Sequence, residues 1–119
     1  MKTLLSALIL LAPMAAHATC APADFVVTNF QVSASNEGLR RQMIMKGELV
    51  NHCTDPAAAQ IQIEAKDASG NVLQTKKGWP AGTTNIAPGQ SASFNLGRMF
   101  HYQSDMQTYA VTVVSVRSW

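Results

Sequence analysis

Alternation of apolar and polar residues is the clearest pattern in this chain. It is strictest over 60–66 (Gln-Ile-Gln-Ile-Glu-Ala-Lys), where every second residue is apolar. Because side chains alternate between the two faces of a β-strand, this segment predicts a strand with one buried face. Residues 67–71 have the composition of a turn, and 72–77 predicts the returning strand of a hairpin.

Four further segments have the β-branched, aromatic or alternating composition of strands, namely 25–33, 41–51, 92–96 and 109–116. The last of these is a long apolar run, which predicts a strand in the centre of a sheet. No segment of the mature chain keeps a helical period over about ten residues. Six to seven short strands with turns between them predict an all-β fold, specifically an antiparallel immunoglobulin-like β-sandwich.

Cys20 and Cys53 are the only cysteines, and the first two predicted strands form a hairpin between them. A hairpin centred on Asn36 and Glu37 would place residues 20 and 53 opposite one another. A shifted register matches the apolar faces better and gives three pairs: Val32 with Met43, Phe30 with Met45, and Val26 with Leu49. Either register predicts a disulfide, which would stabilise the domain by about 3–4 kcal/mol through loop closure.

The N-terminal segment has the pattern of a secretion signal. Lys2 supplies a positive start, residues 4–12 form an apolar run, and an Ala-His-Ala triplet precedes the cut. The run is too short to cross a bilayer, so we expect a signal peptide (1–18) cleaved after Ala18, and no membrane span. The mature domain then covers 19–119 and is periplasmic or secreted, where an oxidising environment favours the disulfide.

Charge adds little to this picture. The chain has a formal net charge of +2, and removal of Lys2 with the signal leaves +1. Its basic doublets, Arg40-Arg41 and Lys76-Lys77, are isolated, whereas nucleic-acid binding requires a concentrated basic face. The composition therefore argues against a nucleic-acid partner and describes one domain of about one hundred residues.

Three motifs follow one another along the domain: Gly-Glu-Leu-Val-Asn at 47–51, Asp-Ala-Ser-Gly-Asn-Val at 67–72, and Ile-Ala-Pro-Gly-Gln-Ser-Ala-Ser-Phe at 86–94. In this order they resemble the FxLYD-type extracytoplasmic domains of bacteria. The pentad that names the family aligns with 63–67, where its Asp is kept and its other defining residues are replaced. The resemblance implies an immunoglobulin-like sandwich outside the cytoplasm, without catalytic residues, and favours an accessory or interaction role.

The mature chain contains no catalytic motif. Its two histidines, His52 and His101, lack the surrounding pattern of a hydrolase nucleophile. Its acidic residues are scattered over turns and polar faces, with no pair placed for glycoside hydrolysis. We therefore expect that the protein is not an enzyme and that it requires no cofactor.

Two loops carry aromatic and basic residues of the kind found in contact surfaces. Trp79 lies in a loop rich in Gly and Pro, where it is either a lid over the core or an anchor for a partner. Arg98, Phe100 and Tyr102 share the segment that joins two predicted strands. Because loops with such residues often bind other molecules, these four residues are the predicted interaction surface. The expected partner is another extracytoplasmic protein.

Copper binding is the leading alternative function. Met99, His101 and Met106 lie in one loop (97–107), and copper accepts both thioether and imidazole ligands. The two methionines of the second predicted strand share a face with a leucine, which favours a place in the core over metal binding. A third hypothesis is a small secreted inhibitor of a hydrolase.

Overall fold

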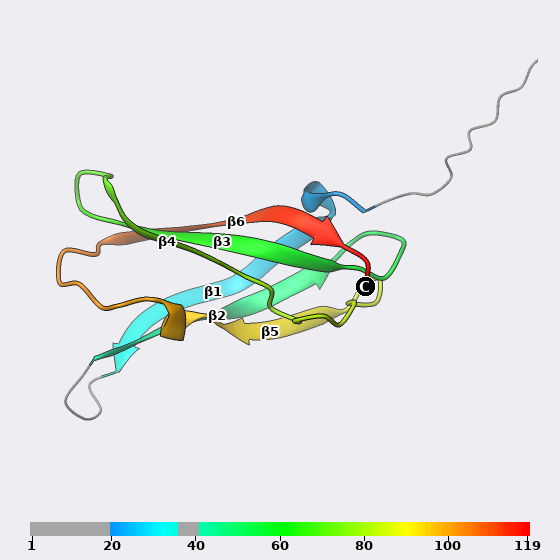
Figure 1. The fold of residues 1–119 in the computed structure, drawn as a ribbon, viewed down its shortest axis with the longest axis horizontal. Helices are drawn as coiled ribbons and strands as arrows, with labels where there is room; N and C mark the ends of the chain where they lie inside the picture. Colours follow the sequence, from blue (N-terminus) through cyan, green and yellow to red (C-terminus); the bar gives the residue numbers. More distant parts are fainter. Residues whose placement is uncertain (1–19, 36–40) are drawn as a thin grey trace, which may run out of the picture.

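The computed structural model describes residues 20–35 and 41–119 (Figure 1). The predicted signal peptide, 1–18, and its cleavage site lie outside the described residues, as does the predicted turn centre at Asn36 and Glu37. Within the described part of the chain, no helix has the length and apolar character that a membrane span requires.

Six β-strands and two short 3-10 turns make up the described chain. The strands are β1 (Phe25–Ser35), β2 (Gln42–Asn51), β3 (Ala58–Lys66), β4 (Val72–Gly78), β5 (Ser91–Asn95) and β6 (Thr108–Arg117). The 3-10 turns are η2 (Pro22–Asp24) and η3 (Gly97–Met99). The all-β fold that the alternation predicts is therefore confirmed.

The strands form two antiparallel three-stranded sheets, in the orders β1-β2-β5 and β4-β3-β6. The chain passes between the sheets after β2, after β4 and after β5 (Figure 1). In the lettering of immunoglobulin domains, this is A-B-E facing C′-C-F. The order confirms the predicted immunoglobulin-like sandwich, here with six described strands.

The core lies between the sheets, and β2 and β3 contribute most of it. Ile61 and Ile63 of β3 are fully buried, as the strict alternation in that strand predicts. Met45 and Leu49 of β2 are also fully buried, and Met43 is 5% exposed. The methionines of β2 therefore pack in the core, which is the place that their shared face with a leucine favours.

The β1–β2 hairpin adopts a register that neither sequence alternative predicts. The observed pairs include Val32 with Met45, Ala34 with Met43, and Val27 with Leu49. The predicted pairs, Val32 with Met43, Phe30 with Met45, and Val26 with Leu49, are therefore wrong. Val26 is 42% exposed, because its neighbour Val27 faces the core instead.

A β-bulge in β1 is the physical reason for this difference. Asn29 and Phe30 both lie opposite Gly47, and Asn29 has a left-handed φ of 55°. The extra residue changes which side chains face the core, so that Val27 before it and Phe30 after it both pack inward. Glycine suits the position opposite the bulge because a Cβ on Gly47 would lie 3.0 Å from the ring of Phe94.

β6 is an outer strand of its sheet, so the prediction of a central strand over 109–116 is wrong. Among the described strands it pairs only with β3. Tyr109, Val111 and Val113 pack against the core, and a bulge at Val114 moves the inward face to Val116. The run is mostly apolar, with Thr112 and Ser115 as its polar residues. The change of inward face at the bulge brings valines to the core on both sides of Val114, so this apolar character does not require pairing on both edges.

Candidate functional site

The two cysteines form a disulfide at the end of the sandwich where the C-terminus lies (Figure 1). Cys20 and Cys53 are joined across 33 residues of sequence, with 5.7 Å between their Cα atoms, so the predicted bond is confirmed. Together with Asp55 they are a group of potential metal-ligating side chains that the described residues bring close together. Because the two sulfurs are bonded to one another, neither is a thiolate ligand.

Asn51 organises the same end of the sandwich. Its side chain is fully buried at the end of β2. Its Nδ2 donates to the carbonyl oxygens of Ile86 at 2.7 Å and Asp55 at 3.0 Å. Its Oδ1 accepts a hydrogen bond from the amide of Cys53 at 2.7 Å. With both amide protons and the oxygen engaged, Asn51 ties β2 to two loops and has a structural role.

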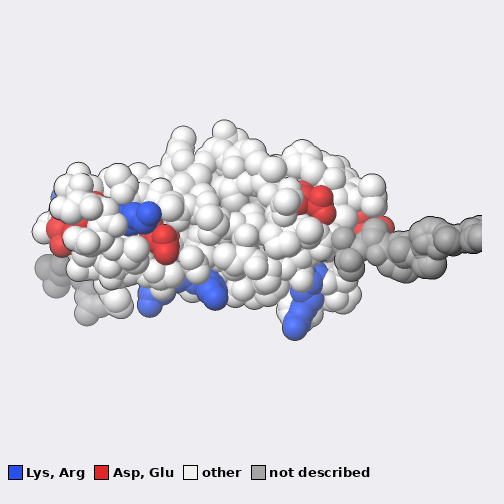
Figure 2. Space-filling model, turned by 90° about the horizontal axis from the view of Figure 1, so that it is seen from above, with Lys and Arg blue, Asp and Glu red and all other residues white. Residues whose placement is uncertain are grey.

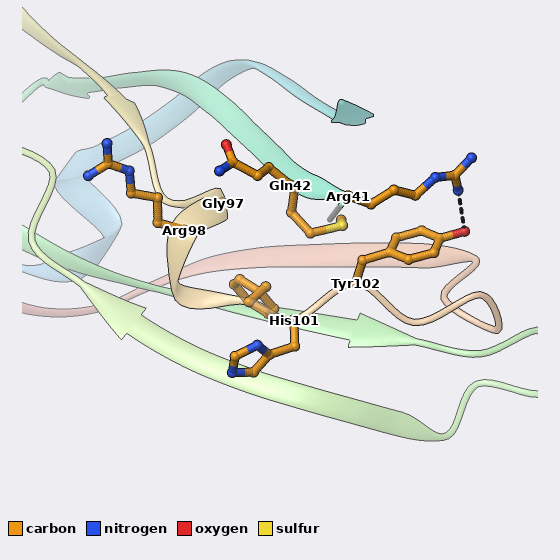
Figure 3. Close-up of a pocket in the computed structure, with 8 residues that line it drawn as sticks. Arg41, Gln42, Gly97, Arg98, His101 and Tyr102 are labelled. Carbon is orange, nitrogen blue, oxygen red and sulfur yellow. Dashed lines mark hydrogen bonds between the residues drawn. The ribbon is translucent and has the colours of Figure 1, made fainter. Parts of the chain in front are cut away.

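A hollow of about 710 Å³ lies where the start of β2 meets the loop that begins at η3 (Figure 3). We call it the η3 hollow, and its described lining residues are Arg41, Gln42, Met43, Gly97, Arg98, Phe100, His101 and Tyr102. Met43 and Phe100 are buried and form an apolar floor. The two arginines, His101 and Tyr102 are exposed and form the rim.

Gly97 allows the loop to lie directly on β2. A Cβ at this position would overlap the carbonyl oxygen of Met43. Asn95 also keeps η3 close to β2, because its Oδ1 accepts hydrogen bonds from the amides of both Met45 at 3.0 Å and Gly97 at 3.1 Å. Any larger residue at Gly97 must therefore move η3 away from β2.

Gln74 of β4 fixes the other side of the loop. Its side-chain amide pairs with the backbone of His101, donating to the carbonyl oxygen at 2.6 Å and accepting from the amide at 3.0 Å. Its Nε2 also donates to the side-chain oxygen of Gln103 at 2.6 Å. Both sheets thus hold this loop, which gives the rim side chains an ordered backbone.

The rim of the η3 hollow is positively charged. Arg41 donates a hydrogen bond to the Tyr102 hydroxyl at 2.7 Å, and its guanidinium lies 4.7 Å from the centroid of that ring. In Figure 3 these two side chains meet on one side of the hollow, while Arg98 extends on the other. The described lining residues include no Asp or Glu. The hollow therefore favours negatively charged groups.

The predicted interaction residues divide between two places. Arg98, Phe100 and Tyr102 line the η3 hollow, but Phe100 is only 5% exposed because its ring packs in the core. Phe100 therefore supports the surface from beneath and does not protrude from it. Trp79 is not a lining residue of the hollow and packs edge to face against Trp119, with 5.9 Å between the ring centroids.

The predicted copper ligands have different environments. Met106 is 8% exposed and belongs to the core cluster, whereas Met99 is 37% exposed. His101 is exposed at the rim of the hollow. Copper binding stays a prediction, with Met99 and His101 as its accessible ligands.

Gln74, which positions the loop, and Arg41, which lines the hollow, are among the site residues that the sequence did not predict. The hydrogen bonds between Gln74 and His101 join residues 27 positions apart, and such a contact leaves no local pattern. Arg41 did leave a signal, since it belongs to a basic doublet directly before an apolar strand. The doublet indicates positive charge at the start of β2, but it does not indicate that the loop with Tyr102 lies beside it.

Two shifted pKa values lie outside the lining of the hollow. A hydrogen bond from the backbone amide of Asn71 is the main cause that lowers the pKa of Asp67 in the β3–β4 turn. Burial raises the pKa of Tyr109, and the neighbouring Tyr102 raises it further. A turn carboxylate and a partly buried phenol commonly have such shifts, so neither indicates a catalytic acid or base.

Comparison with protein-family models, curated protein sequences and solved structures finds no match to this chain. The resemblance to FxLYD-type domains therefore stays a prediction.

Proposed function

We propose that this chain is a non-enzymatic, extracytoplasmic β-sandwich module that acts by binding a partner protein at the η3 hollow. The observation that supports this proposal best is the composition of the hollow, which has a buried apolar floor and an exposed rim of Arg, His and Tyr. Protein interfaces commonly combine an apolar centre with a polar rim. Arg and Tyr are also enriched among the residues that contribute most binding energy.

The fixed loop is the second argument for this site. Gln74 holds the backbone of His101, and the close contact of Gly97 with β2 holds the start of the same loop. A surface that is ordered before binding loses less conformational entropy when a partner docks. The loop is therefore suited to specific recognition of another protein.

The charge of the rim favours an acidic segment of the partner. Arg98 makes no hydrogen bond or ion pair with the described residues, so its guanidinium is available to a carboxylate. Arg pairs with carboxylates in a bidentate geometry that also fixes their orientation. We expect Asp or Glu of the partner to meet Arg98, with Tyr102 contributing contact area.

The disulfide supports a location outside the cytoplasm, because such bonds persist mainly in oxidising compartments. The predicted signal peptide is consistent with that location. Inhibition of a secreted hydrolase would be a special case of the proposed function, in which the bound partner is an enzyme.

Site-specific photo-crosslinking in the producing cell tests the proposal. A photoreactive amino acid replaces Tyr102, and in a control it replaces the exposed Gln90, which lies at the Asn51 end of the sandwich. We expect a discrete crosslinked partner from position 102 and none from position 90. Arg98→Glu should weaken its binding by about tenfold or more, whereas Arg98→Lys keeps part of it.

The proposal requires both position dependence and charge dependence. A crosslinking pattern at position 102 that equals the pattern at Gln90 would contradict it. Equal binding of the Arg98→Glu variant and the wild type to the isolated partner would also contradict it, provided that the two have the same thermal stability.

A further inference from the structure

Residues 20–24, which we call the η2 strap, run from Cys20 through η2 to the start of β1. Cys20 is half-buried, and Ala21, Pro22 and Ala23 are exposed. η2 packs against β6, where Figure 1 draws it in blue, and none of its residues is buried. η2 therefore lies on the surface of the sandwich, outside the core.

Among the described residues, hydrogen bonds join only the last residue of the η2 strap to the rest of the domain. The Asp24 carbonyl oxygen accepts from the His52 amide at 2.8 Å, which continues the pairing of β1 with β2. Two further bonds stay within the strap: the Asp24 amide donates to the Ala21 carbonyl oxygen at 2.9 Å, and the Ala21 amide donates to the Asp24 carboxylate at 2.8 Å. Residues 20–23 therefore depend on the disulfide and on surface packing for their position.

The two ends of the disulfide differ in how they are anchored. Cys53 is 9% exposed, and its amide donates to the buried Oδ1 of Asn51 at 2.7 Å. Cys20 has no comparable bond, because its Sγ lies 3.5 Å from the Asp55 carbonyl oxygen but a disulfide sulfur has no proton to donate. When the disulfide is opened, Cys53 keeps its place in the sandwich, whereas Cys20 loses the bond that holds it.

An apolar groove of about 370 Å³ lies beside the η2 strap. Pro22 and Ala23 of the strap line it, together with residues of β1 and with Val111 and Val113 of β6. None of the described lining residues is charged. Figure 2, seen from the side on which β6 lies uppermost in Figure 1, shows a broad uncharged area in the middle of this face. Release of the strap would therefore widen the groove and expose apolar side chains of β6.

We infer that the Cys20–Cys53 disulfide is a redox latch: it holds the η2 strap beside β6, and its reduction releases the strap while the sandwich stays folded. The reductant is a dithiol, either a protein with two neighbouring thiols or a small molecule. One of its thiolates attacks the sulfur of the more exposed cysteine, Cys20, and Cys53 leaves as a thiolate. The second thiolate then attacks the reductant's sulfur in this mixed disulfide and frees Cys20. Two electrons and two protons pass to the protein, and the reductant becomes a disulfide.

The latch makes access to the groove depend on the redox state of the domain. The core does not depend on the η2 strap, because the largest fully buried side chains, such as Met45, Ile61 and Ile63, belong to β2 and β3. Reduction therefore changes the surface beside β6 and leaves the two sheets in place. This inference goes beyond the proposed function, because the groove and the η3 hollow share no described lining residue.

NMR relaxation of the mature protein, oxidised and after reduction with dithiothreitol, tests the inference. In the oxidised protein we expect amide order parameters of about 0.85 both for Ala23 of the strap and for Ile63 of β3. On reduction the value for Ala23 should fall below about 0.6, while the value for Ile63 does not change. A neutral paramagnetic solute should broaden the methyl signals of Val111 and Val113 more strongly in the reduced protein, because the groove is then more open.

Two variants separate release of the η2 strap from a general loss of stability. Cys20→Ser should reproduce the release without a reductant, and an ordered Ala23 in this variant would overturn the inference. Oxidised Ile61→Val is the control, because it weakens the core while it keeps the disulfide, and Ala23 should stay ordered in it.

Three further results would overturn the inference. The first is an order parameter for Ala23 that is equal in the oxidised and the reduced protein. The second is a loss of signal dispersion throughout the reduced protein, because the latch requires that the sandwich stays folded after the strap is released. The third is release of the strap in the Ile61→Val control.

Discussion

Replacement of Asn51 by Leu is the sharpest test of how the domain is held together. The two side chains have the same branched shape and the same number of heavy atoms, and Leu is the larger, so the substitution removes hydrogen bonds without leaving a cavity. It removes the donor to the carbonyl oxygens of Ile86 and Asp55 and the acceptor for the amide of Cys53. We expect a loss of stability, because a buried polar group without a partner costs free energy.

The size of the expected stability loss depends on which of the three backbone groups bonded to Asn51 keep another hydrogen-bond partner in the variant. The Ile86 carbonyl still accepts from the amide of Ala57 at 3.2 Å, so it is not left unpaired. The Asp55 carbonyl is partly buried and is reached by water at moderate cost. The Cys53 amide is buried and loses its acceptor entirely. At about 1–3 kcal/mol for each unsatisfied buried group, the total destabilisation is about 2–4 kcal/mol.

Urea and thermal unfolding of the oxidised protein measure this value. For a domain of this size, a loss of about 2–4 kcal/mol lowers Tm by roughly 10–25 °C. The matched control is Asn85→Leu, which removes two hydrogen bonds to the exposed backbone of Trp119. Because water replaces those bonds, we expect the control to lose less than about 1 kcal/mol. An Asn51→Leu protein within 1 kcal/mol of wild type would refute the reasoning.

The Asn51→Asp variant tests the direction in which stability changes with pH. The carboxyl oxygen that replaces Nδ2 faces the carbonyl oxygens of Ile86 and Asp55, so the ionised form is repelled and the protonated form can donate to one of them. Burial and repulsion therefore raise the folded-state pKa of this carboxyl above its unfolded value of about 3.9. A raised folded-state pKa means that stability relative to wild type is best below pH 4 and falls as pH rises through that pKa. A difference from wild type that is constant between pH 4 and 7 would contradict this account.

Four further outcomes are expected. Cys53→Ala should destabilise the domain by about 3–4 kcal/mol in chemical unfolding, and equal stability would contradict the loop-closure argument. Gly97→Ala should cost about 1–3 kcal/mol and abolish partner crosslinking, because its Cβ overlaps a carbonyl oxygen of β2. The lowered pKa of Asp67 means that its contribution is present above its unfolded pKa and lost as pH falls through the folded one, so its carboxyl should titrate below 3.8 by NMR. If copper binds, Met99→Ala/His101→Ala should weaken Cu(I) affinity in a competition titration, and unchanged affinity removes that hypothesis.

The positions of the strands along the chain could be predicted from local sequence patterns. The pairing register of β1 with β2 and the place of β6 at the edge of its sheet could not. Over 60–66 the alternation is unbroken, and the buried residues of β3 are the ones it predicts. In β1 the bulge at Asn29 changes the inward face, so an uninterrupted alternation assigns Val26 to the core in error. Asn tolerates the left-handed conformation, but most Asn residues in strands do not mark a bulge. The residues packed at the bulge include Gly47 of β2, which lies opposite it, and Phe94 of β5, which pairs with Gly47, so the local sequence of β1 does not contain them.

Only the residue types of the proposed binding surface could be predicted from the sequence. Arg98 and Tyr102 were identified because a loop with basic and aromatic residues indicates contact. Their neighbours in space were not identified, because Arg41 lies directly before β2 and Gln74 lies in β4, and tertiary packing brings both to the loop. Trp79 was grouped with them on composition alone, and its contact with Trp119 places it in a separate cluster.

The motifs that carry the family resemblance have structural roles in this fold, so their presence indicates the architecture of the domain and not what it binds. Gly47 makes room beside a bulge, Asn51 holds two loops, and Asp67 accepts amide hydrogen bonds within a turn. A sandwich that needs the same bulge, loop contact and turn would select the same residues whatever it binds. Arg98 and Tyr102 have no comparable role in holding the strands together. Substitutions at these two positions should therefore change partner binding with little change in stability, and that separation distinguishes a binding site from another part of the scaffold.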